Sequence, residues 1–184
     1  ISDDGQPVAN SNLFRLAMQY ADHFGLFIMS HSEYKNLVGD GVMNEGFVST
    51  KLGLPGTTRA AEEVMIARDI LVAEAEGKRI HLCHVSTRGG VQLVREAKAR
   101  GVRVTAETTP HYIGATDEWV IGYDSRCRVN PPLREEADRQ ACIDGLCDGT
   151  IDVIATDHAP HHEDEKRCEF HIAASGISGF ETAF

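Results

Sequence analysis

The stretch RIHLCHVSTRGGVQLVREAKARGVRVTAET, residues 79–108, decides the fold. It opens with a short apolar run that is rich in β-branched and other strand-forming residues. Apolar residues at helical spacing follow it: Val91, Val94 and Ala97. Gly101 is suited to end that helix, and residues 102–108 resemble a second strand. A strand, a helix and a strand in close succession predict a βαβ unit with parallel strands.

The same alternation continues on both sides of this unit. Helices are predicted over 10–24, 58–75 and 135–148, and strands over 26–30 and 151–156. The spacing of apolar residues also predicts which positions of the first two helices face the core: Leu13, Leu16, Ala17, Tyr20 and Phe24, then Val64, Ala67 and Leu71. The run over 151–156 is continuously apolar, which is typical of a strand buried on both faces.

Repeated strand–helix units with apolar strands predict a parallel sheet covered by helices. That order fits either a doubly wound sheet or a β/α barrel. We find no repeat or linker and therefore expect one domain over 1–184, although 184 residues fall short of the roughly 250 of a complete barrel. No glycine-rich phosphate loop follows a strand, which argues against the nucleotide-binding variants.

The composition is that of an ordinary globular chain with an acidic balance. Eighteen Lys and Arg residues stand against 28 Asp and Glu residues, a net charge of −10, with 42% hydrophobic residues. No basic run compensates, so we expect neither a nucleic-acid nor a membrane partner. The start ISDDGQPVAN lacks a signal-peptide pattern, which favours a cytoplasmic protein. Five cysteines without a CxxC pair indicate reduced thiols rather than disulfides.

Residues of the kinds that bind metals stand near four predicted strand ends: Asp3 and Asp4 before Gly5, His31, His84 and Asp157. In parallel α/β folds the carboxyl ends of the strands converge, so we expect side chains from these four strand ends to share one site. Imidazole and carboxylate donors without a thiolate favour a catalytic Zn²⁺. Asp3, beside Asp4, is expected to serve the turn or to support the site from behind.

Two further choices concern histidines. His81 and His84 differ by three positions, an odd step along a strand, so we expect only one of them to face the site. We predict His84, nearer the strand end, and expect His81 to pack among helices. In TDHAPHHEDEK, residues 156–166, Asp157 and His161 are predicted to be functional, whereas the acidic residues after them are expected to form a solvated loop.

Motifs along the whole chain point to one family. They are SDDG at 2–5, HSE at 31–33, MNEG at 43–46, HLCHVST at 81–87, TAETTPH at 105–111, VNPPLR at 129–134, DGTIDVIATDHAPH at 148–161, EK at 165–166 and GISGFETAF at 176–184. TDHAPH together with NPPLR is the specific combination. The chain thereby resembles the class I dihydroorotases of the amidohydrolase superfamily.

The resemblance implies a partial (β/α)8 TIM barrel of the metal-dependent amidohydrolase type, with a centre of one or two zinc ions. The implied reaction is hydrolysis of the cyclic amide of dihydroorotate, or the reverse closure of N-carbamoyl-L-aspartate in pyrimidine biosynthesis. Asp4 is implied as a bridging carboxylate, and His31 and His84 as ligands of one zinc. Asp157 is implied as a ligand of the other and as the group that carries the proton to the leaving nitrogen.

The same resemblance implies the substrate contacts. Asn130 and His161 correspond to side chains that bind the substrate, and the backbone at Ser175 and Gly176 lies near its ring. An imidazole at His161 can donate a hydrogen bond to an anionic substrate carboxylate. Such a donor is useful in a chain this acidic, because the negative charge of the chain repels an anionic substrate.

The chain also departs from the family pattern. Ser32, Tyr112 and Ala174 stand where the family usually has Cys, His and Pro. The family's HxH pair, which completes the zinc centre, and the arginine after it are not among these residues. We therefore expect a central portion of a longer dihydroorotase, with little activity by itself and with self-association through unpaired strand edges.

Other interpretations stay open at this point. A hydantoinase or allantoinase would use the same chemistry, and Asn130 is the residue that favours dihydroorotase over them. A non-catalytic dihydroorotase-like scaffold for aspartate transcarbamoylase typically loses its metal ligands, whereas the four predicted here are present. A metal-binding α/β domain without a partner is the remaining alternative, and zinc stoichiometry would discriminate among these.

Overall fold

A four-stranded parallel sheet forms the centre of the computed structural model, which describes residues 1–183. Its strands, in spatial order, are β1 (Ile28–Ser30), β4 (Ile80–Leu82), β5 (Val104–Thr108) and β6 (Val153–Ile154). In register, Ile28 lies beside Ile80, and Ile80 beside Val104. A parallel bridge between Ser2 and Met29 adds the start of the chain to the outer side of β1.

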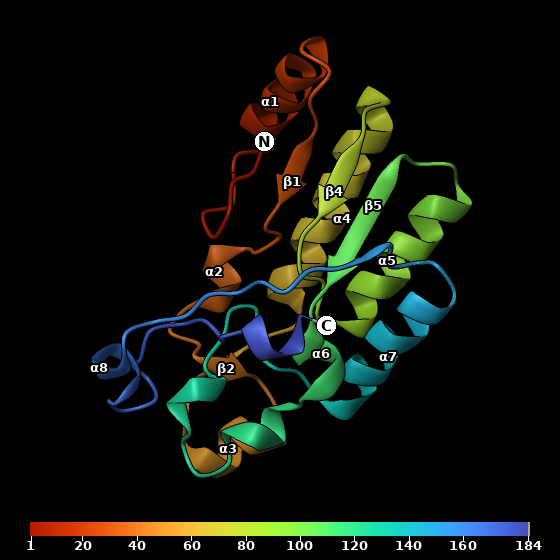
Figure 1. The fold of residues 1–184 in the computed structure, drawn as a ribbon. Helices are drawn as coiled ribbons and strands as arrows, with labels where there is room; N and C mark the ends of the chain where they lie inside the picture. The colour runs from red at the N-terminus through yellow and green to blue at the C-terminus, as the bar shows by residue number, and fades with distance from the viewer. Residues whose placement is uncertain (184) are drawn as a thin grey trace.

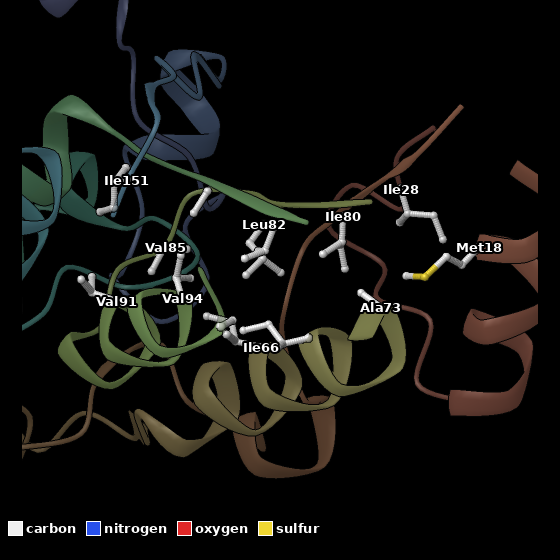
Figure 2. Packing of buried hydrophobic residues seen from close by; sticks show 14 of the residues in the cluster. Met18, Ile28, Ile66, Ala73, Ile80, Leu82, Val85, Val91, Val94 and Ile151 are labelled. Carbon is white, nitrogen blue, oxygen red and sulfur yellow. The ribbon is translucent and has the colours of Figure 1, made fainter. Parts of the chain in front are cut away.

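The longer helices connect these strands: α1 (Ser11–His23), α4 (Ala60–Glu76), α5 (Arg88–Ala99) and α7 (Glu136–Cys147). Side chains from all four helices join one hydrophobic cluster with Ile80, Leu82 and Val104 of the sheet. Because alternate strand residues point to opposite faces, this cluster lies on a single face of the sheet (Figure 2). The helices therefore cover one face only, as they do outside a barrel.

Strand order settles the choice between the two α/β architectures. Each new strand along the chain is added on the same side of the sheet, and the order β1-β4-β5-β6 contains no reversal. A doubly wound sheet reverses its order and carries helices on both faces. The observed arrangement is instead that of consecutive units of a β/α barrel, which confirms the predicted partial barrel.

Short elements gather where the sheet strands end (Figure 1). They are α2 (Lys35–Val38), β2 (Met43–Asn44), α3 (Phe47–Leu52), β3 (Gly56–Thr57), α6 (Pro110–Gly114), η1 (Asp117–Val120), η2 (Ser125–Cys127), α8 (Glu163–Lys166) and η3 (Phe180–Thr182). β2 and β3 pair in parallel as a small second sheet. Within residues 1–183, no helix has the length and apolar character needed to cross a bilayer.

The predicted helices and strands all form, and local chemistry explains two helix starts. Asn10 caps α1, because its side-chain oxygen accepts hydrogen bonds from the backbone N–H groups of Asn12 and Leu13 at 3.0 Å. Thr87 caps α5 in the same way through the N–H of Gly90, at 3.0 Å. The α5 stripe over Val91, Val94 and Ala97 is buried, as predicted.

The predicted core faces of α1 and α4 are wrong. α1 buries Phe14, Met18 and Ala21, whereas Tyr20 is 70% exposed. Leu13, Leu16 and Phe24 are exposed as well, and of the predicted α1 stripe only Ala17 packs against the core cluster, partly buried. In α4 the buried residues include Met65, Ile66 and Ile70, whereas the predicted Val64, Ala67 and Leu71 are not buried. Both helices carry apolar residues on more than one side, so that spacing alone identified a helix without choosing its buried face.

The strand near 151–156 also differs from the prediction. Ile151 is buried, but Val153 and Ile154 of β6 are 45% and 52% exposed. β6 is paired only with β5 among the described residues and lies at the edge of the sheet. Val153 and Ile154 are thus open to solvent on both faces, and the prediction of a strand buried on both faces is wrong.

The contrast between Leu82 and Leu71 tests the packing. Leu82 is fully buried between the sheet and its helices, whereas Leu71 of α4 is 61% exposed. We expect Leu82→Ala to lower the free energy of unfolding by about 2–5 kcal/mol, because it leaves a cavity. The matched change Leu71→Ala should cost less than about 0.5 kcal/mol. Urea denaturation of the two variants measures both values, and equal losses would contradict the assigned helix face.

Candidate metal centre

The loops after β1 and β4 bring His31 and His84 together. Nδ1 of His31 lies 2.7 Å from Nε2 of His84, and the ring centroids are 4.6 Å apart. Both side chains are buried. The parallel pairing of β1 with β4 explains the meeting, since it sets the carboxyl ends of these strands side by side. Two imidazole nitrogens from different β/α units therefore converge on one point, as the sequence predicted.

The backbone is strained at two of the predicted ligands. His84 has a φ of +38° and Asp157 a φ of +45°. Within residues 1–183, Tyr123 is the one other non-glycine residue with a positive φ. Such a conformation is costly for a residue with a Cβ atom and persists where the surroundings hold it, often at functional sites. The strain thus marks the ends of β4 and β6 independently of the residue types there.

His81 does not pack among helices, and that expectation is wrong. Its neighbours Ile80 and Leu82 point toward the helices, so His81 projects from the opposite face of the sheet. There its Nδ1 lies 2.8 Å from the Thr105 hydroxyl, and its Nε2 lies 2.9 Å from a carboxylate oxygen of Glu107. The prediction from the odd spacing of His81 and His84 failed because β4 ends at Leu82. The alternation of side chains between the two faces does not extend to His84.

The surroundings of His84 fit a metal ligand. Burial lowers the pKa of His84, and a positive charge on His31 would lower it further, while the carboxylate of Asp157 acts in the opposite direction. The imidazole is thereby kept neutral, which is the form that binds metals. Its Nδ1 is buried and has no hydrogen-bond partner among residues 1–183. A neutral imidazole facing a second imidazole, with a carboxylate nearby, is a donor set suited to zinc.

Asn130 and Glu33 border the histidine pair. The side-chain nitrogen of Asn130 lies 3.4 Å from Nε2 of His31, and a Glu33 carboxylate oxygen lies 3.5 Å from the same atom. Burial alone would raise the pKa of Glu33, but hydrogen bonds with His31, Lys35 and Asn130 outweigh burial and lower that pKa to about 2. Glu33 is therefore ionised beside His31. The sequence analysis missed its role, although its spacing two residues after His31 was a usable signal.

The two aspartates of the SDDG segment make different contacts. Asp3 supports His31, because its Oδ1 accepts a hydrogen bond from the His31 backbone N–H at 2.8 Å. The carboxylate of Asp4 forms no hydrogen bond or ion pair with His31 or His84 in the described part of the chain. It lies near enough to Cys83 for its charge to act on that thiol, as does Asp157. The ligand role of Asp4 stays a prediction.

The predicted substrate contacts after β6 form a second group. Nε2 of His161 lies 3.0 Å from the carbonyl oxygen of Ser175. A parallel bridge between His158 and Ile177 holds the two segments together. Gly176 has no room for a side chain, since a Cβ there would lie 2.5 Å from the Ala159 carbonyl oxygen and 2.9 Å from Nε2 of His161. Gly176 thus permits a close approach of the backbone to His161.

Asn130, beside the histidine pair, and Ser175, of the second group, line one cavity. It has a volume of about 180 Å³, and Glu33, Asn130 and Ser175 are among its lining residues. Asn130 touches His31, and Ser175 touches His161. The structure therefore brings Asn130 to 3.4 Å from His31 of the histidine pair and places Ser175 on the same cavity, whereas His161 and Gly176 line a different cavity of about 330 Å³.

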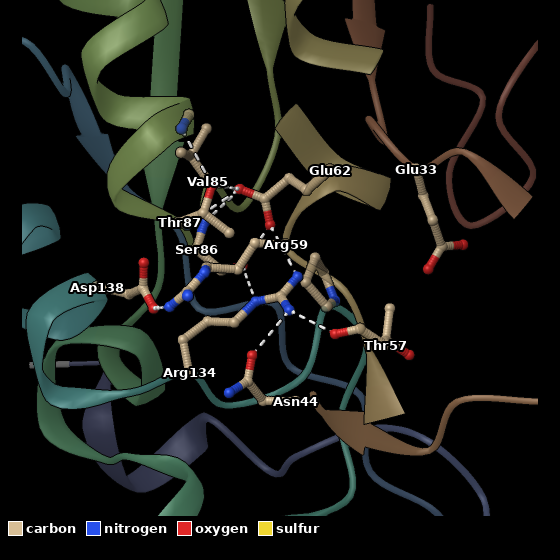
Figure 3. A network of polar contacts seen from close by, with 12 residues as sticks. Glu33, Asn44, Thr57, Arg59, Glu62, Val85, Ser86, Thr87, Arg134 and Asp138 are labelled. Carbon is tan, nitrogen blue, oxygen red and sulfur yellow. Dashed lines mark hydrogen bonds and ion pairs between the residues drawn. The ribbon is translucent and has the colours of Figure 1, made fainter. Parts of the chain in front are cut away.

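A buried polar network holds the loops that carry these residues (Figure 3). Glu62 of α4 accepts hydrogen bonds from the backbone N–H groups of Ser86 and Thr87, at 2.9 and 3.1 Å. Arg134, four residues after Asn130, donates to the Asn44 side chain and the Thr57 carbonyl, both at 3.2 Å. A guanidinium nitrogen of Arg134 lies 3.6 Å from Glu62. The network thus joins the loop after His84 to the segment of Asn130.

Comparisons with known proteins agree with this geometry. A family profile described as "Dihydro-orotase-like" matches residues 1–90. A protein of Pelotomaculum thermopropionicum named dihydroorotase is 60% identical over 182 residues, which is 99% of this chain and 43% of that protein. A dihydroorotase of Geobacter sp. (strain M21) is 57% identical over 183 residues, with 100% and 43% covered. The chain thus spans less than half the length of these curated relatives.

Solved structures of similar fold include proteins named hydantoinase or dihydropyrimidinase. An L-hydantoinase (dihydropyrimidinase) from Arthrobacter aurescens superposes with a TM-score of 0.78 at 24% identity, over 99% of this chain and 42% of that one. A dihydropyrimidinase from Brevibacillus agri NCHU1002 gives 0.76 at 20% identity, over 96% and 41%. These likenesses establish the fold. The family profile and the sequence relatives show that the chain belongs to the dihydroorotase-like family.

Proposed function

We propose that the protein containing this chain is a zinc-dependent dihydroorotase. It hydrolyses the cyclic amide of dihydroorotate and, in reverse, closes N-carbamoyl-L-aspartate during pyrimidine biosynthesis in the cytoplasm. The observation that carries the proposal is the meeting of His31 and His84 at 2.7 Å. It occurs in a chain that is 55–60% identical to proteins named dihydroorotase.

Metal dependence is a property of this family, and we propose zinc as the metal. His31 and His84 would hold one ion, and Asp4 and Asp157 would complete a centre of one or two ions. Imidazole and carboxylate donors support zinc over softer metals, which prefer thiolates. Bound there, zinc supplies a nucleophile at neutral pH and a Lewis acid for the amide carbonyl.

Asp157 is proposed to move the proton. Its left-handed backbone after β6 and the action of its charge on His84 support this role. A carboxylate at that position can take a proton from the nucleophile and deliver it to the leaving nitrogen, provided that it reaches both by hydrogen bonds. Its role is therefore realised in the transition state rather than in substrate binding.

Asn130, His161, Ser175 and Gly176 are proposed to bind the substrate. Asn130 adjoins His31, so its amide can orient the ring beside the metal ligands. His161 can donate a hydrogen bond to the substrate carboxylate. The close approach at Gly176 holds the backbone of Ser175 and Gly176 beside His161, and we propose that this segment lies near the ring amide. A chain of net charge −10 requires such donors to hold an anion.

The alternatives are less well supported. The hydantoinase-like structures are at most 24% identical, so they bear on the fold and not on the substrate. A scaffold for aspartate transcarbamoylase would not need Asp4, His31, His84 and Asp157, all of which are present. Association with aspartate transcarbamoylase remains compatible with an active enzyme.

Self-association is a further part of the proposal. The domain is proposed to be a single incomplete barrel over 1–184, with β6 exposed at one edge of the sheet. Val153 and Ile154 are half-exposed on this edge strand, and such edges pair with other chains. Sedimentation velocity of the 184-residue chain should show oligomers, and a monomer at all concentrations would contradict this expectation.

A substrate panel on the full-length protein tests the proposed activity. We expect kcat/KM for dihydroorotate to exceed that for hydantoin, dihydrouracil and allantoin by at least about a hundredfold, since polar groups built for one substrate reject analogues that leave them unpaired. A chelator should remove the activity, and zinc should restore it. Preference for an uncharged ring, or activity that survives complete metal removal, would refute the proposal.

Substitutions of Asp157 and His161 should change different kinetic constants. We expect Asp157→Asn to lower kcat by about 10²- to 10⁴-fold with little change in KM, because general acid–base catalysis is lost. We expect His161→Gln to raise KM by about tenfold or more with a smaller effect on kcat, because a hydrogen bond to a charged group is lost.

Matched controls lie close by in the sequence. Asp164 has a side chain that is 89% exposed, and His171 is also exposed. Asp164→Asn and His171→Gln should therefore leave both kinetic constants within about twofold. If Asp157→Asn changes only KM, or if the controls match the test variants, the assigned roles are wrong.

A further inference from the structure

Asp69 of α4 is a fully buried acid that the proposed reaction does not use. One of its carboxylate oxygens, Oδ2, accepts hydrogen bonds from the hydroxyls of Ser30 and Ser32, at 2.7 and 3.0 Å. The other, Oδ1, accepts a hydrogen bond from Nε of Arg68 at 2.6 Å. Both oxygens are therefore occupied, and Oδ2 is shared by the two residues that flank His31 in the sequence.

Two separate elements thus hold the chain at His31. Asp69 binds the residue before His31 and the residue after it, Ser30 and Ser32, from the side of α4. Asp3, at the start of the chain, accepts a hydrogen bond from the backbone N–H of His31 at 2.8 Å. Hydrogen bonds on three consecutive residues restrict the backbone there, and so they restrict the direction in which the imidazole leaves the end of β1.

Arg68 holds the carboxylate of Asp69 in one orientation. Its Nη1 donates a hydrogen bond to the carbonyl oxygen of Val8 at 2.8 Å, and its guanidinium carbon lies 4.4 Å from the ring centroid of Phe14. A planar guanidinium stacked on an aromatic ring has little freedom to turn. The position of Asp69 is therefore set by its surroundings before it meets the two serines.

The same helix carries the acid that holds the loop after β4. Glu62 lies seven residues before Asp69, which is about two helical turns, so the two acids point to the same side of α4. Glu62 accepts hydrogen bonds from the backbone N–H groups of Ser86 and Thr87, at 2.9 and 3.1 Å. One rigid helix thereby holds the chain beside both histidines of the candidate metal centre.

Stability alone does not explain an acid at this place. Burial raises the pKa of Asp69, while Arg68 and the hydroxyls of Ser30 and Ser32 act in the opposite direction. Replacement of a buried ion pair by well-packed apolar side chains is often neutral or stabilising. What an apolar side chain could not supply is the pair of hydrogen bonds on either side of His31.

We propose that Asp69 is a positioning residue for the metal centre. Through the two serines it keeps the imidazole of His31 turned toward that of His84, where the nitrogens lie 2.7 Å apart. This inference rests on the proposed role of His31 as a metal ligand. Its action passes through Ser30 and Ser32, so Asp69 is not itself a ligand.

Zinc affinity of the full-length protein tests the role of Asp69. The probe is Zn²⁺ alone, added to the metal-free protein in competition with a chelator of known affinity. An amide has one oxygen and cannot accept hydrogen bonds from both Arg68 and the serines. We therefore expect Asp69→Asn to weaken binding of the ion that His31→Ala removes by about tenfold or more, as is typical when the support of a metal ligand is lost.

Asp138→Asn is the matched control. Asp138 of α7 is equally buried, and its carboxylate accepts hydrogen bonds from the backbone N–H of Arg88 at 3.0 Å and from Arg59 at 3.1 Å. Urea denaturation should show lower stability for this variant, as for Asp69→Asn. Its zinc affinity should stay within about twofold of the wild-type value, because it supports no metal ligand. An equal loss of zinc affinity in both variants would overturn the proposal.

Ser32→Ala provides a second variant that leaves α4 unchanged, so the test holds even if Asp69→Asn does not fold. We expect it to weaken zinc binding by about threefold or more, because one hydrogen bond to a charged group is lost. Combined with Asp69→Asn it should add little, since both changes break the same connection. Unchanged zinc affinity in Ser32→Ala, or losses that multiply in the double variant, would contradict the positioning role.

These outcomes are separate from those of the proposed function. If the wild-type protein binds zinc and hydrolyses dihydroorotate while the variants keep their zinc affinity, the positioning role of Asp69 alone is refuted. If the wild-type protein binds no zinc, the proposed function and the positioning role are both refuted.

Discussion

Parallel pairing of β1 with β4 is the constraint on which the site depends. It sets Ile28 beside Ile80, so the residues just beyond both strands emerge at the same edge of the sheet. His31 and His84, 53 residues apart in sequence, therefore meet there at 2.7 Å. A sheet that added its strands on alternate sides would have separated them. The barrel-like order of strands is thus the direct cause of the chemistry at the strand ends.

Holding the loops at that edge requires charged groups in the interior. Glu62 and Arg134 are both buried, and each satisfies backbone and side-chain partners of segments distant in sequence (Figure 3). Removing one member of such a network leaves the other charge without a partner and typically costs several kcal/mol. The left-handed backbone of His84 is therefore kept in place by its surroundings, in particular by the loop contacts of Glu62 at Ser86 and Thr87.

The sequence predicted the elements well because spacing and capping residues act locally. It also predicted that His31 and His84 would meet, since both follow strands of consecutive units. It could not select the buried face of α1, where both Phe14 and Leu13 are apolar, because that choice depends on the sheet. The surroundings of His81 were predicted wrongly because the residue types do not show where β4 ends. The interior role of Glu62 could not be predicted because a buried acid and a surface acid look alike in sequence, whereas Glu33 was missed although its spacing after His31 was a signal.

The proposed catalytic chemistry requires that His31 and His84 share a metal ion. Diffraction from the zinc-loaded, full-length protein at the zinc absorption edge tests this claim most directly. We expect an anomalous peak at bonding distance, about 2.0–2.1 Å, from both Nδ1 of His31 and Nε2 of His84. A zinc-saturated crystal in which these nitrogens remain hydrogen-bonded to each other, with no peak between them, would contradict a shared metal ion.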